Sequence, residues 1–232
     1  MRLCCSGVRL TRGRFDMIAD GVFEPGIHLV SGRIGSGKST LAHILAGVRP
    51  PAAGVVSAEG ITTTGLLMQF SEYHVTAPTV AGEIRSWGPE PEAILAETGL
   101  TGREGDHPLR LSRGELRRLH LACMLAQPWD LLILDEPFSA LDGRQKELLC
   151  RRLEQRPAGI VIIMTHEPLH LPACDMLWEI VQGTLMYRGR IPDALPAWDG
   201  APSQVRSLLD RGVVPENITP AAIREARCRI RG

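Results

Sequence analysis

The ten residues from Ser31 to Thr40, SGRIGSGKST, place the strongest constraint on what this chain can fold into. An apolar run, IHLV, precedes them, and an apolar-periodic stretch, LAHILAG, follows. Glycines at this spacing let successive backbone N–H groups curl around an anion, because no Cβ atom obstructs the approach. The segment Gly32–Ser39 fits the pattern G-x-x-x-x-G-K-[ST], which between a strand and a helix predicts a loop that binds phosphate.

Lys38 is one of only two lysines among the 26 basic residues of the chain. An ammonium group on a thin stem fits inside a tight ring of amides, whereas a planar guanidinium does not. The helix that begins near Lys38 also directs the positive end of its dipole at the anion. We therefore expect Lys38 to meet the β- and γ-phosphates, and Ser39 to offer its hydroxyl to Mg²⁺. The predicted nucleotide-contacting residues of this segment are Gly32, Arg33, Ile34, Gly35, Ser36, Gly37, Lys38, Ser39 and Thr40.

A phosphate loop of this kind needs an acid for the metal, and the apolar run LLILDEP supplies one at the end of a predicted strand. Asp135 is placed to hold Mg²⁺, and the next residue, Glu136, is placed to polarise the attacking water. Two acids at a strand end are common by themselves. The functional interpretation of these two acids rests on the phosphate loop that precedes them in the chain.

Composition excludes several other classes of protein. The net charge of zero gives no electrostatic argument for binding nucleic acid or an anionic membrane. None of the six cysteines forms a Cys-x-x-Cys pair, and no cysteine–histidine cluster has zinc spacing, so the usage suits a reducing cytosol. No apolar segment resembles a signal peptide, and runs such as IVIIM are far shorter than the ~20 residues that cross a bilayer.

Buried strands alternate with amphipathic helices along much of the chain. Strands are expected at IHLV, GVVSAEG, TGLLMQF, WDLLILD and GIVIIMT, with a hairpin turning at Gln182-Gly183; helices are expected over 38–46 and within SRGELRRLHLACMLAQ and SALDGRQKELLCRRLEQR. In the second helix Leu116, Leu119, Cys123 and Ala126 share one face, and Ser112 with Glu115 forms a capping-box pattern. The segment 71–110, rich in Pro, Gly and Glu, is expected to form a separate helical insert. This pattern indicates an α/β fold with a P-loop NTPase core, whose sheet is mostly parallel.

Six motifs in order give the chain a resemblance to the ATPase subunits of ABC (ATP-binding cassette) transporters. The phosphate loop resembles the Walker A motif, LLILDE the Walker B motif, and Gln69 in LLMQF the Q-loop glutamine. LSRGE, from Leu111 to Glu115, is similar to the signature LSGGQ, SALD to the D-loop, and THE to the switch-histidine motif. The resemblance implies a small antiparallel β subdomain and a helical subdomain, at about 71–118, within an ATPase domain of 1–190. A tail with short helices then covers 191–232.

The resemblance also implies roles that the residues alone do not reveal. His166 would contact the γ-phosphate, and Gln69 would touch Mg²⁺ or water and face a membrane subunit. Two ATPase chains, identical or related, would sandwich two ATP molecules head to tail, each completing the partner's site. By itself Ser112 would be read as a helix cap. The residues expected to act on the nucleotide of the partner chain are Ser112, Gly114, Glu115 and Asp142.

The segment QFSEYHVTAPTVAGEIRSWGP and the tail further resemble the energy-coupling factor (ECF) group of importers. This implies a transmembrane scaffold subunit and a small substrate-capturing membrane subunit, with a vitamin or a transition-metal ion as substrate. The ATPase would then lie on the cytoplasmic face of the membrane as a peripheral subunit. The alternatives are the ATPase of another ABC importer or exporter, a soluble ABC protein of translation or DNA maintenance, and a regulator that no longer hydrolyses ATP.

The chain departs from the family pattern at several positions. Arg113 stands where the signature has glycine, and Glu115 where it has glutamine. No tyrosine precedes the phosphate loop to stack on adenine, so Phe15 is the nearest aromatic candidate. Apolar and aromatic residues between Phe70 and Trp87 are expected either to receive the membrane subunit or to form the core of the insert. Some of these residues, Tyr73 first among them, are expected to be partly exposed.

Overall fold

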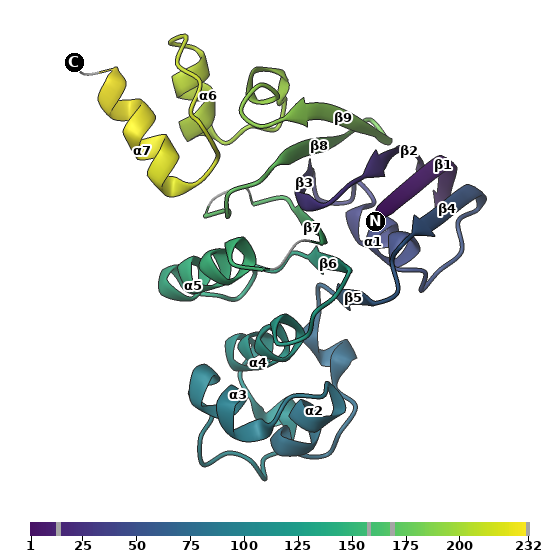
Figure 1. Cartoon of the computed structure of the whole chain (residues 1–232), viewed down its shortest axis with the longest axis vertical. Helices are drawn as coiled ribbons and strands as arrows, with labels where there is room; N and C mark the ends of the chain where they lie inside the picture. The colour runs from purple at the N-terminus through teal and green to yellow at the C-terminus, as the bar shows by residue number, and fades with distance from the viewer. Residues whose placement is uncertain (13–14, 157–158, 168–169, 231–232) are drawn as a thin grey trace.

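The computed structural model describes residues 1–12, 15–156, 159–167 and 170–230. Its strands form one sheet of nine strands in the order β4-β1-β2-β9-β8-β3-β7-β6-β5. Figure 1 shows the helices grouped around this sheet, with the insert at the bottom of the view and the tail at the top. The result is the expected α/β P-loop NTPase fold, with parallel and antiparallel parts joined in a single sheet.

The parallel part carries the central strands. β3 pairs in parallel with β7 on one side and with β8 on the other, and β6 lies between β7 and β5. Every residue of β6 and β7 is buried, because helices or neighbouring elements cover both faces of a parallel sheet. These strands are β3 (Gly26–Gly32), β5 (Thr64–Leu67), β6 (Leu131–Asp135), β7 (Ile160–Thr165) and β8 (Met176–Val181).

The antiparallel part includes two N-terminal strands that sequence analysis did not predict, together with the expected strand at GVVSAEG and the second strand of the expected hairpin. β1 pairs antiparallel with both β2 and β4, and β9 links this part to β8. Leu3, Cys5, Val8 and Leu10 are buried along β1, and the change of phase after Cys5 coincides with a register irregularity. That irregularity obscures the alternation expected of a strand. The strands are β1 (Arg2–Arg12), β2 (Phe15–Phe23), β4 (Ala53–Glu59) and β9 (Thr184–Arg190).

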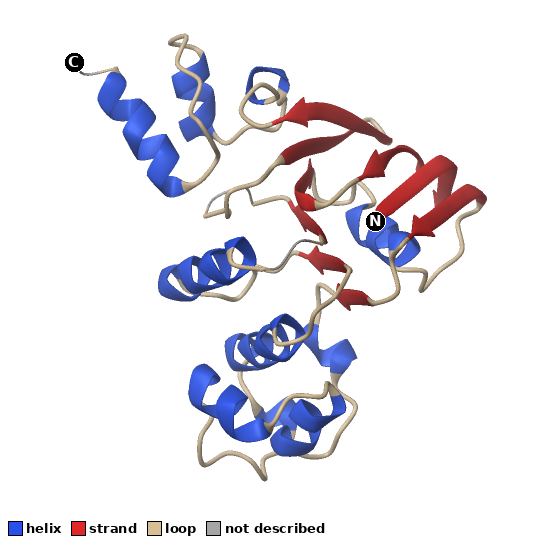
Figure 2. Cartoon of the chain, viewed as in Figure 1, coloured by secondary structure: helices blue, strands red, loops and turns tan. Residues whose placement is uncertain are grey.

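Helices lie on both faces of the sheet, as Figure 2 shows. α1 (Lys38–Leu45) packs Leu41 and Ile44 into a core shared with the antiparallel strands. α5 (Gly143–Glu154) packs Leu149 and Leu153 into a second core on the opposite side of the parallel strands. The two helices therefore cover opposite faces of the sheet.

The insert between β5 and β6 is helical and has a core of its own. Val80, Ile84 and Leu100 are fully buried there, together with Leu116 and Cys123 from its last helix. Its elements are η1 (Ser71–His74), α2 (Val80–Ser86), α3 (Pro91–Thr98), η2 (Pro108–Arg110) and α4 (Arg113–Leu125). The prediction that Ala126 shares the buried face of α4 is wrong: the helix ends at Leu125, and Ala126 is its exposed C-cap residue.

The tail contains η3 (Leu195–Ala197), α6 (Ser203–Leu209) and α7 (Pro220–Arg229). α6 and α7 share a small core, but Leu195 and Trp198 pack into the core beneath the parallel strands. The indole N–H of Trp198 donates to Ser31 Oγ at 2.8 Å, directly before the phosphate loop. No helix among the described residues is both long and apolar enough to cross a bilayer.

Candidate functional site

The phosphate loop joins the end of β3 to the start of α1, as its sequence requires. Gly35 and Gly37 have φ values of 79° and 96°, which favour glycine, and Gly37 is the N-cap residue of α1. A Cβ at Gly32 would lie 2.8 Å from Ser36 Oγ, so the loop is also too tight for a side chain there. The backbone is therefore shaped as an open cradle at the positive end of a helix.

The ammonium group of Lys38 lies inside this loop. Its Nζ donates to the carbonyl oxygens of Gly32 at 2.7 Å and Arg33 at 3.1 Å, and it lies 3.7 Å from Glu136 Oε1. Burial lowers the pKa of Lys38, and the nearby carboxylates of Glu136 and Asp135 act in the opposite direction. A compact cation thus sits where the loop backbone and the acidic strand end converge.

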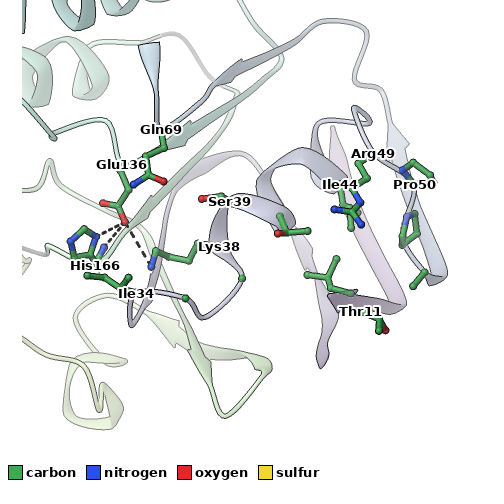
Figure 3. Close-up of a pocket in the computed structure, with 16 residues that line it drawn as sticks. Thr11, Ile34, Lys38, Ser39, Ile44, Arg49, Pro50, Gln69, Glu136 and His166 are labelled. Carbon is green, nitrogen blue, oxygen red and sulfur yellow. Dashed lines mark hydrogen bonds and ion pairs between the residues drawn. The ribbon is translucent and has the colours of Figure 1, made fainter. Parts of the chain in front are cut away.

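Glu136 follows β6, and three groups hold its carboxylate. Thr165 Oγ1 donates to Oε2 at 2.8 Å, while the backbone N–H of His166 lies 3.0 Å from Oε1. The Nδ1 atom of His166 lies 2.7 Å from the same oxygen. Figure 3 shows Lys38, Glu136 and His166 converging, with Gln69 and Ser39 pointing into the same space. The carboxylate of Glu136 is therefore contacted from two segments distant in sequence, at Lys38 and at Thr165–His166.

Asp135 ends β6 and is 2% exposed. Burial raises its pKa, and a hydrogen bond with Ser39 acts in the opposite direction. Among the described residues, the buried Oδ1 atom of Asp135 has no hydrogen-bond partner. An unpartnered carboxylate oxygen beside a hydroxyl is the hard oxygen donor set that Mg²⁺ prefers. The residues present therefore fit a magnesium ion.

A cavity of about 630 Å³ extends from these groups along the outside of α1. Lys38, Ser39, Thr40, Gln69, Glu136 and His166 line one end. Leu10, Thr11, Ile44 and the segment 49–52 line the other, between α1 and the antiparallel strands (Figure 3). Phe15, our candidate for stacking on a base, begins β2, but its side chain lies outside the described part of the chain.

The remaining predicted residues lie away from this cavity. Ser112 and Glu115 cap α4 reciprocally, with the backbone N–H of Ser112 donating to Glu115 Oε2 at 2.7 Å. Asp142 caps α5 in the same manner, accepting from the backbone N–H of Gln145 at 2.9 Å. Gly114 lies beside Ala140. A Cβ atom at Gly114 would lie 3.0 Å from the carbonyl oxygen of Ala140. One chain therefore does not bring these residues to its own phosphate loop.

Sequence analysis missed several residues of the site. Thr165 was detectable, because it directly precedes His166 and ends a strand of the same sheet edge. The apolar wall formed by Leu10, Pro50 and Pro51 could not be detected from the sequence, because it depends on how β1 and β4 fold over α1. Arg117 had no sequence signal, because an arginine in an amphipathic helix is normally a solvated residue.

Comparison with known proteins agrees with this geometry. A model of the ABC transporter family matches residues 22–139. The aliphatic sulfonates import ATP-binding protein of Rhodococcus jostii is 34% identical over 194 residues, which covers 78% of this chain and 79% of that protein. An energy-coupling factor transporter ATP-binding protein of Thermotoga maritima is 32% identical over 190 residues, covering 72% and 73%. The thiamine import ATP-binding protein of Brucella abortus is 31% identical over 194 residues, covering 72% and 80%.

Solved structures share the fold. The ATP-binding subunit of an ABC transporter superposes with a TM-score of 0.72 at 17% identity, covering 100% of both chains. A dimeric bacterial ABC transporter cassette superposes with a TM-score of 0.65 at 18% identity, covering 79% of this chain and 96% of that one.

Proposed function

The chain belongs to the ABC transporter family as an ATP-binding subunit, and from this premise we propose that it hydrolyses ATP to drive an ECF-type importer. The family membership and the ATPase activity follow from the matches to import ATPases. The observation that carries the residue roles is the meeting of Lys38, Glu136 and His166 in one cavity, 3.7 Å and 2.7 Å apart at Glu136 Oε1. A cation that meets the phosphates, a base that meets the water and an imidazole that holds the base form a set that can support phosphate-bond hydrolysis.

The proposed division of labour follows from these contacts. The amides of the phosphate loop and the ammonium of Lys38 bind the β- and γ-phosphates, since both are fixed before any nucleotide enters. Glu136 polarises the attacking water, and Thr165 orients its carboxylate. His166 contacts the γ-phosphate from the same side. Leu10, Ile44 and Pro50 would face the base, because they form the apolar end of the cavity.

We propose that Ser39, Asp135 and Gln69 hold Mg²⁺ together with the phosphates. When bound, the ion neutralises charge that develops on the phosphate oxygens. The unpartnered Oδ1 of Asp135 supports this assignment. Ser112, Gly114, Glu115 and Asp142 are proposed to act on the nucleotide of a second ATPase chain. Their distance from the chain's own cavity supports an arrangement like that of the dimeric structural relative.

A membrane partner is required for transport, and the surface after the Q-loop residue is our candidate for receiving it. Tyr73 and Phe70 are 72% and 54% exposed, and their rings pack edge to face at 5.8 Å. Val80 and Ile84, by contrast, belong to the core of the insert. Phe70 and Tyr73 are thus the exposed large hydrophobic residues of the segment 70–87. We propose that the chain docks there, on the cytoplasmic face of the membrane, as a peripheral subunit.

The ECF assignment itself predicts a transmembrane scaffold subunit and a small substrate-capturing membrane subunit, and a vitamin or a transition-metal ion as substrate. The second candidate is a subunit of another kind of importer. The relative named for sulfonate import favours it, because it is slightly more similar than the relative named for energy coupling. Membrane proteins that co-purify with the chain distinguish the two candidates. A set without a substrate-capturing subunit contradicts the ECF assignment.

The chemistry is tested with two variants. Lys38→Ala removes the charge matched to the phosphates, so we expect at least a tenfold loss of MgATP affinity. Glu136→Gln keeps the shape of the side chain but cannot accept the proton of water, so we expect unchanged affinity and at least ~100-fold slower phosphate release. Equilibrium nucleotide binding and phosphate release are measured on the same samples. Wild-type turnover in Glu136→Gln contradicts the role proposed for the glutamate.

A further inference from the structure

Arg117 connects the helical insert to the ends of two neighbouring core strands. It lies in α4, the helix that Ser112 caps, and its side chain is 2% exposed. Its Nη1 donates to the carbonyl oxygen of Met68 at 2.7 Å, directly after β5. Its Nη2 donates to the carbonyl oxygens of Asp135 and Glu136, at 2.9 Å and 2.6 Å. One planar guanidinium thus joins the main chain after β5 to the main chain at the end of β6.

Both of these chain segments carry proposed site residues. Met68 is followed by Gln69, and the insert holds the main chain of Met68 on both sides. While its carbonyl accepts from Arg117, its N–H donates to Nε2 of His74 at 2.9 Å. β5 ends at Leu67, so side chains of the insert replace sheet pairing at the next residue. The position of Gln69 therefore depends on how the insert is docked.

Glu136 is held in a backbone conformation that needs support. Its φ is 48°, in the left-handed region, which is unfavourable for a residue other than glycine. Its carbonyl oxygen accepts from Arg117, and also from the backbone N–H and the hydroxyl of Ser139 at 3.2 Å and 2.9 Å. Its own N–H donates to the carbonyl of Met164 at 2.8 Å. Arg117 is the one member of this set that comes from the insert.

Packing alone does not explain a charge at this place. Burial lowers the pKa of Arg117 to about 10, so the guanidinium is still charged at neutral pH. The carboxylates of Asp135, Glu136 and Glu72 raise its pKa in part, but none of the ion pairs within the described residues includes Arg117. Its Nε has no hydrogen-bond partner among the described residues. An apolar side chain would avoid the cost of burying such a charge. An apolar side chain, however, could not hold several carbonyl oxygens at fixed angles.

We propose that Arg117 is a positioning residue for ATP hydrolysis, which couples the docking of the helical insert to the placement of Glu136 and Gln69. The inference rests on the proposed roles of those two residues. Arg117 does not line the cavity beside the phosphate loop, so it acts on the reaction only through the main chain that it holds. When the insert moves relative to the sheet, these hydrogen bonds must move with it or break.

The test separates turnover from nucleotide binding. In Arg117→Met, which keeps length and burial but removes every donor, we expect kcat to fall by ~10- to 100-fold while MgATP affinity changes less than ~3-fold. Arg117→Lys offers a single ammonium that cannot hold both strand ends, so we expect an intermediate kcat. The matched control is Arg118→Met, since within the described part of the chain Arg118 donates only to Thr98 of the insert, at 3.4 Å. We expect wild-type turnover in this control.

Two results would overturn the inference. One is a parallel loss of kcat and nucleotide affinity in Arg117→Lys, which indicates a general loss of structure. The other is wild-type kcat in either Arg117 variant. Hydrogen exchange at the backbone amides of Met68 and Glu136 provides a readout independent of turnover: we expect faster exchange there in Arg117→Lys, and unchanged exchange in the amides of α1. Because wild-type phosphate release is measured in the same assay, a failure of the proposed function is distinguishable from a failure of this inference.

Discussion

His74 should make the stability of this protein fall on mild acidification. Its ring is 8% exposed and packs against His120 and Trp87, with centroids 5.3 Å and 5.6 Å away. Burial, followed by the nearby charges of His120 and Arg117, lowers its pKa from 6.5 to about 4, and Glu83 opposes this only in part. The neutral ring uses Nε2 to accept from the N–H of Met68. Protonation would remove that acceptor.

The sign and size of the effect follow from the two pKa values. Between pH 6.5 and about 4 the unfolded chain binds a proton at His74 that the folded chain does not bind, so stability falls as pH falls. When the pH falls from about 7.5 to about 5, ~1.5 units of this fall lie below the unfolded-state pKa of 6.5. Each of these units corresponds to ~1.4 kcal/mol. We therefore expect His74 to reduce the free energy of unfolding by about 2 kcal/mol over this range.

The assay is chemical unfolding of the wild type and of His74→Gln at both pH values. Glutamine offers an oxygen near the position of Nε2, so the acceptor for Met68 is retained while the titrating group is lost. Effects of other groups, such as His28, whose pKa burial also lowers, cancel in the comparison. The loss of stability from protonating Glu83 occurs below this pH window. Burial raises the pKa of Glu83, but hydrogen bonds, first that of His120, lower it to about 2. An equal pH dependence in both proteins would refute the reasoning.

Two further predictions concern surfaces. The side chain of Arg113 is 90% exposed and lies 4.0 Å from Glu72, so we expect it to stabilise the ATP-bound dimer through long-range charge, with dimer affinity falling as salt rises. Sedimentation of a non-hydrolysing Glu136→Gln dimer measures this, and tighter association after Arg113→Gly would show that the arginine obstructs the dimer. Tyr73→Asp should abolish co-purification with the membrane subunit and leave MgATP affinity unchanged, because its ring is largely exposed. Retained co-purification would remove Tyr73 from the docking surface.

The sequence was most informative where local rules and tertiary packing agree. Fully apolar runs ending in chemistry-bearing residues, such as the strand before Asp135, predicted both the parallel sheet and the edge at which the site lies. The exposure of Tyr73 was predicted correctly, whereas the buried face of α4 was extended one residue too far, to Ala126. Periodicity shows which residues are apolar, but it does not show where a helix stops.

The rest depended on contacts between segments distant in sequence. Leu10 lines the cavity because β1 pairs with β4 across an irregular register, which no local pattern reveals. Arg117 is buried because the insert folds back onto two strand ends, 49 and 19 residues away at Met68 and Glu136. Such a residue is indistinguishable in sequence from the half-buried Arg118 beside it, which contacts only the insert among the described residues. Its role becomes visible only when the carbonyl groups around it are known.

The position of β3 in the sheet has a consequence for the order of events during synthesis. β3 is synthesised before both of its neighbours in the sheet: it pairs with β7 on one side and β8 on the other, both made more than 120 residues later. Ser31, the last residue of β3 before the phosphate loop, also accepts a hydrogen bond from Trp198, which is synthesised later still. Until those segments emerge, the nascent phosphate loop follows an apolar strand with no partner. The capacity to bind nucleotide is therefore acquired only after those segments have been made, and β3 needs shielding from aggregation until then.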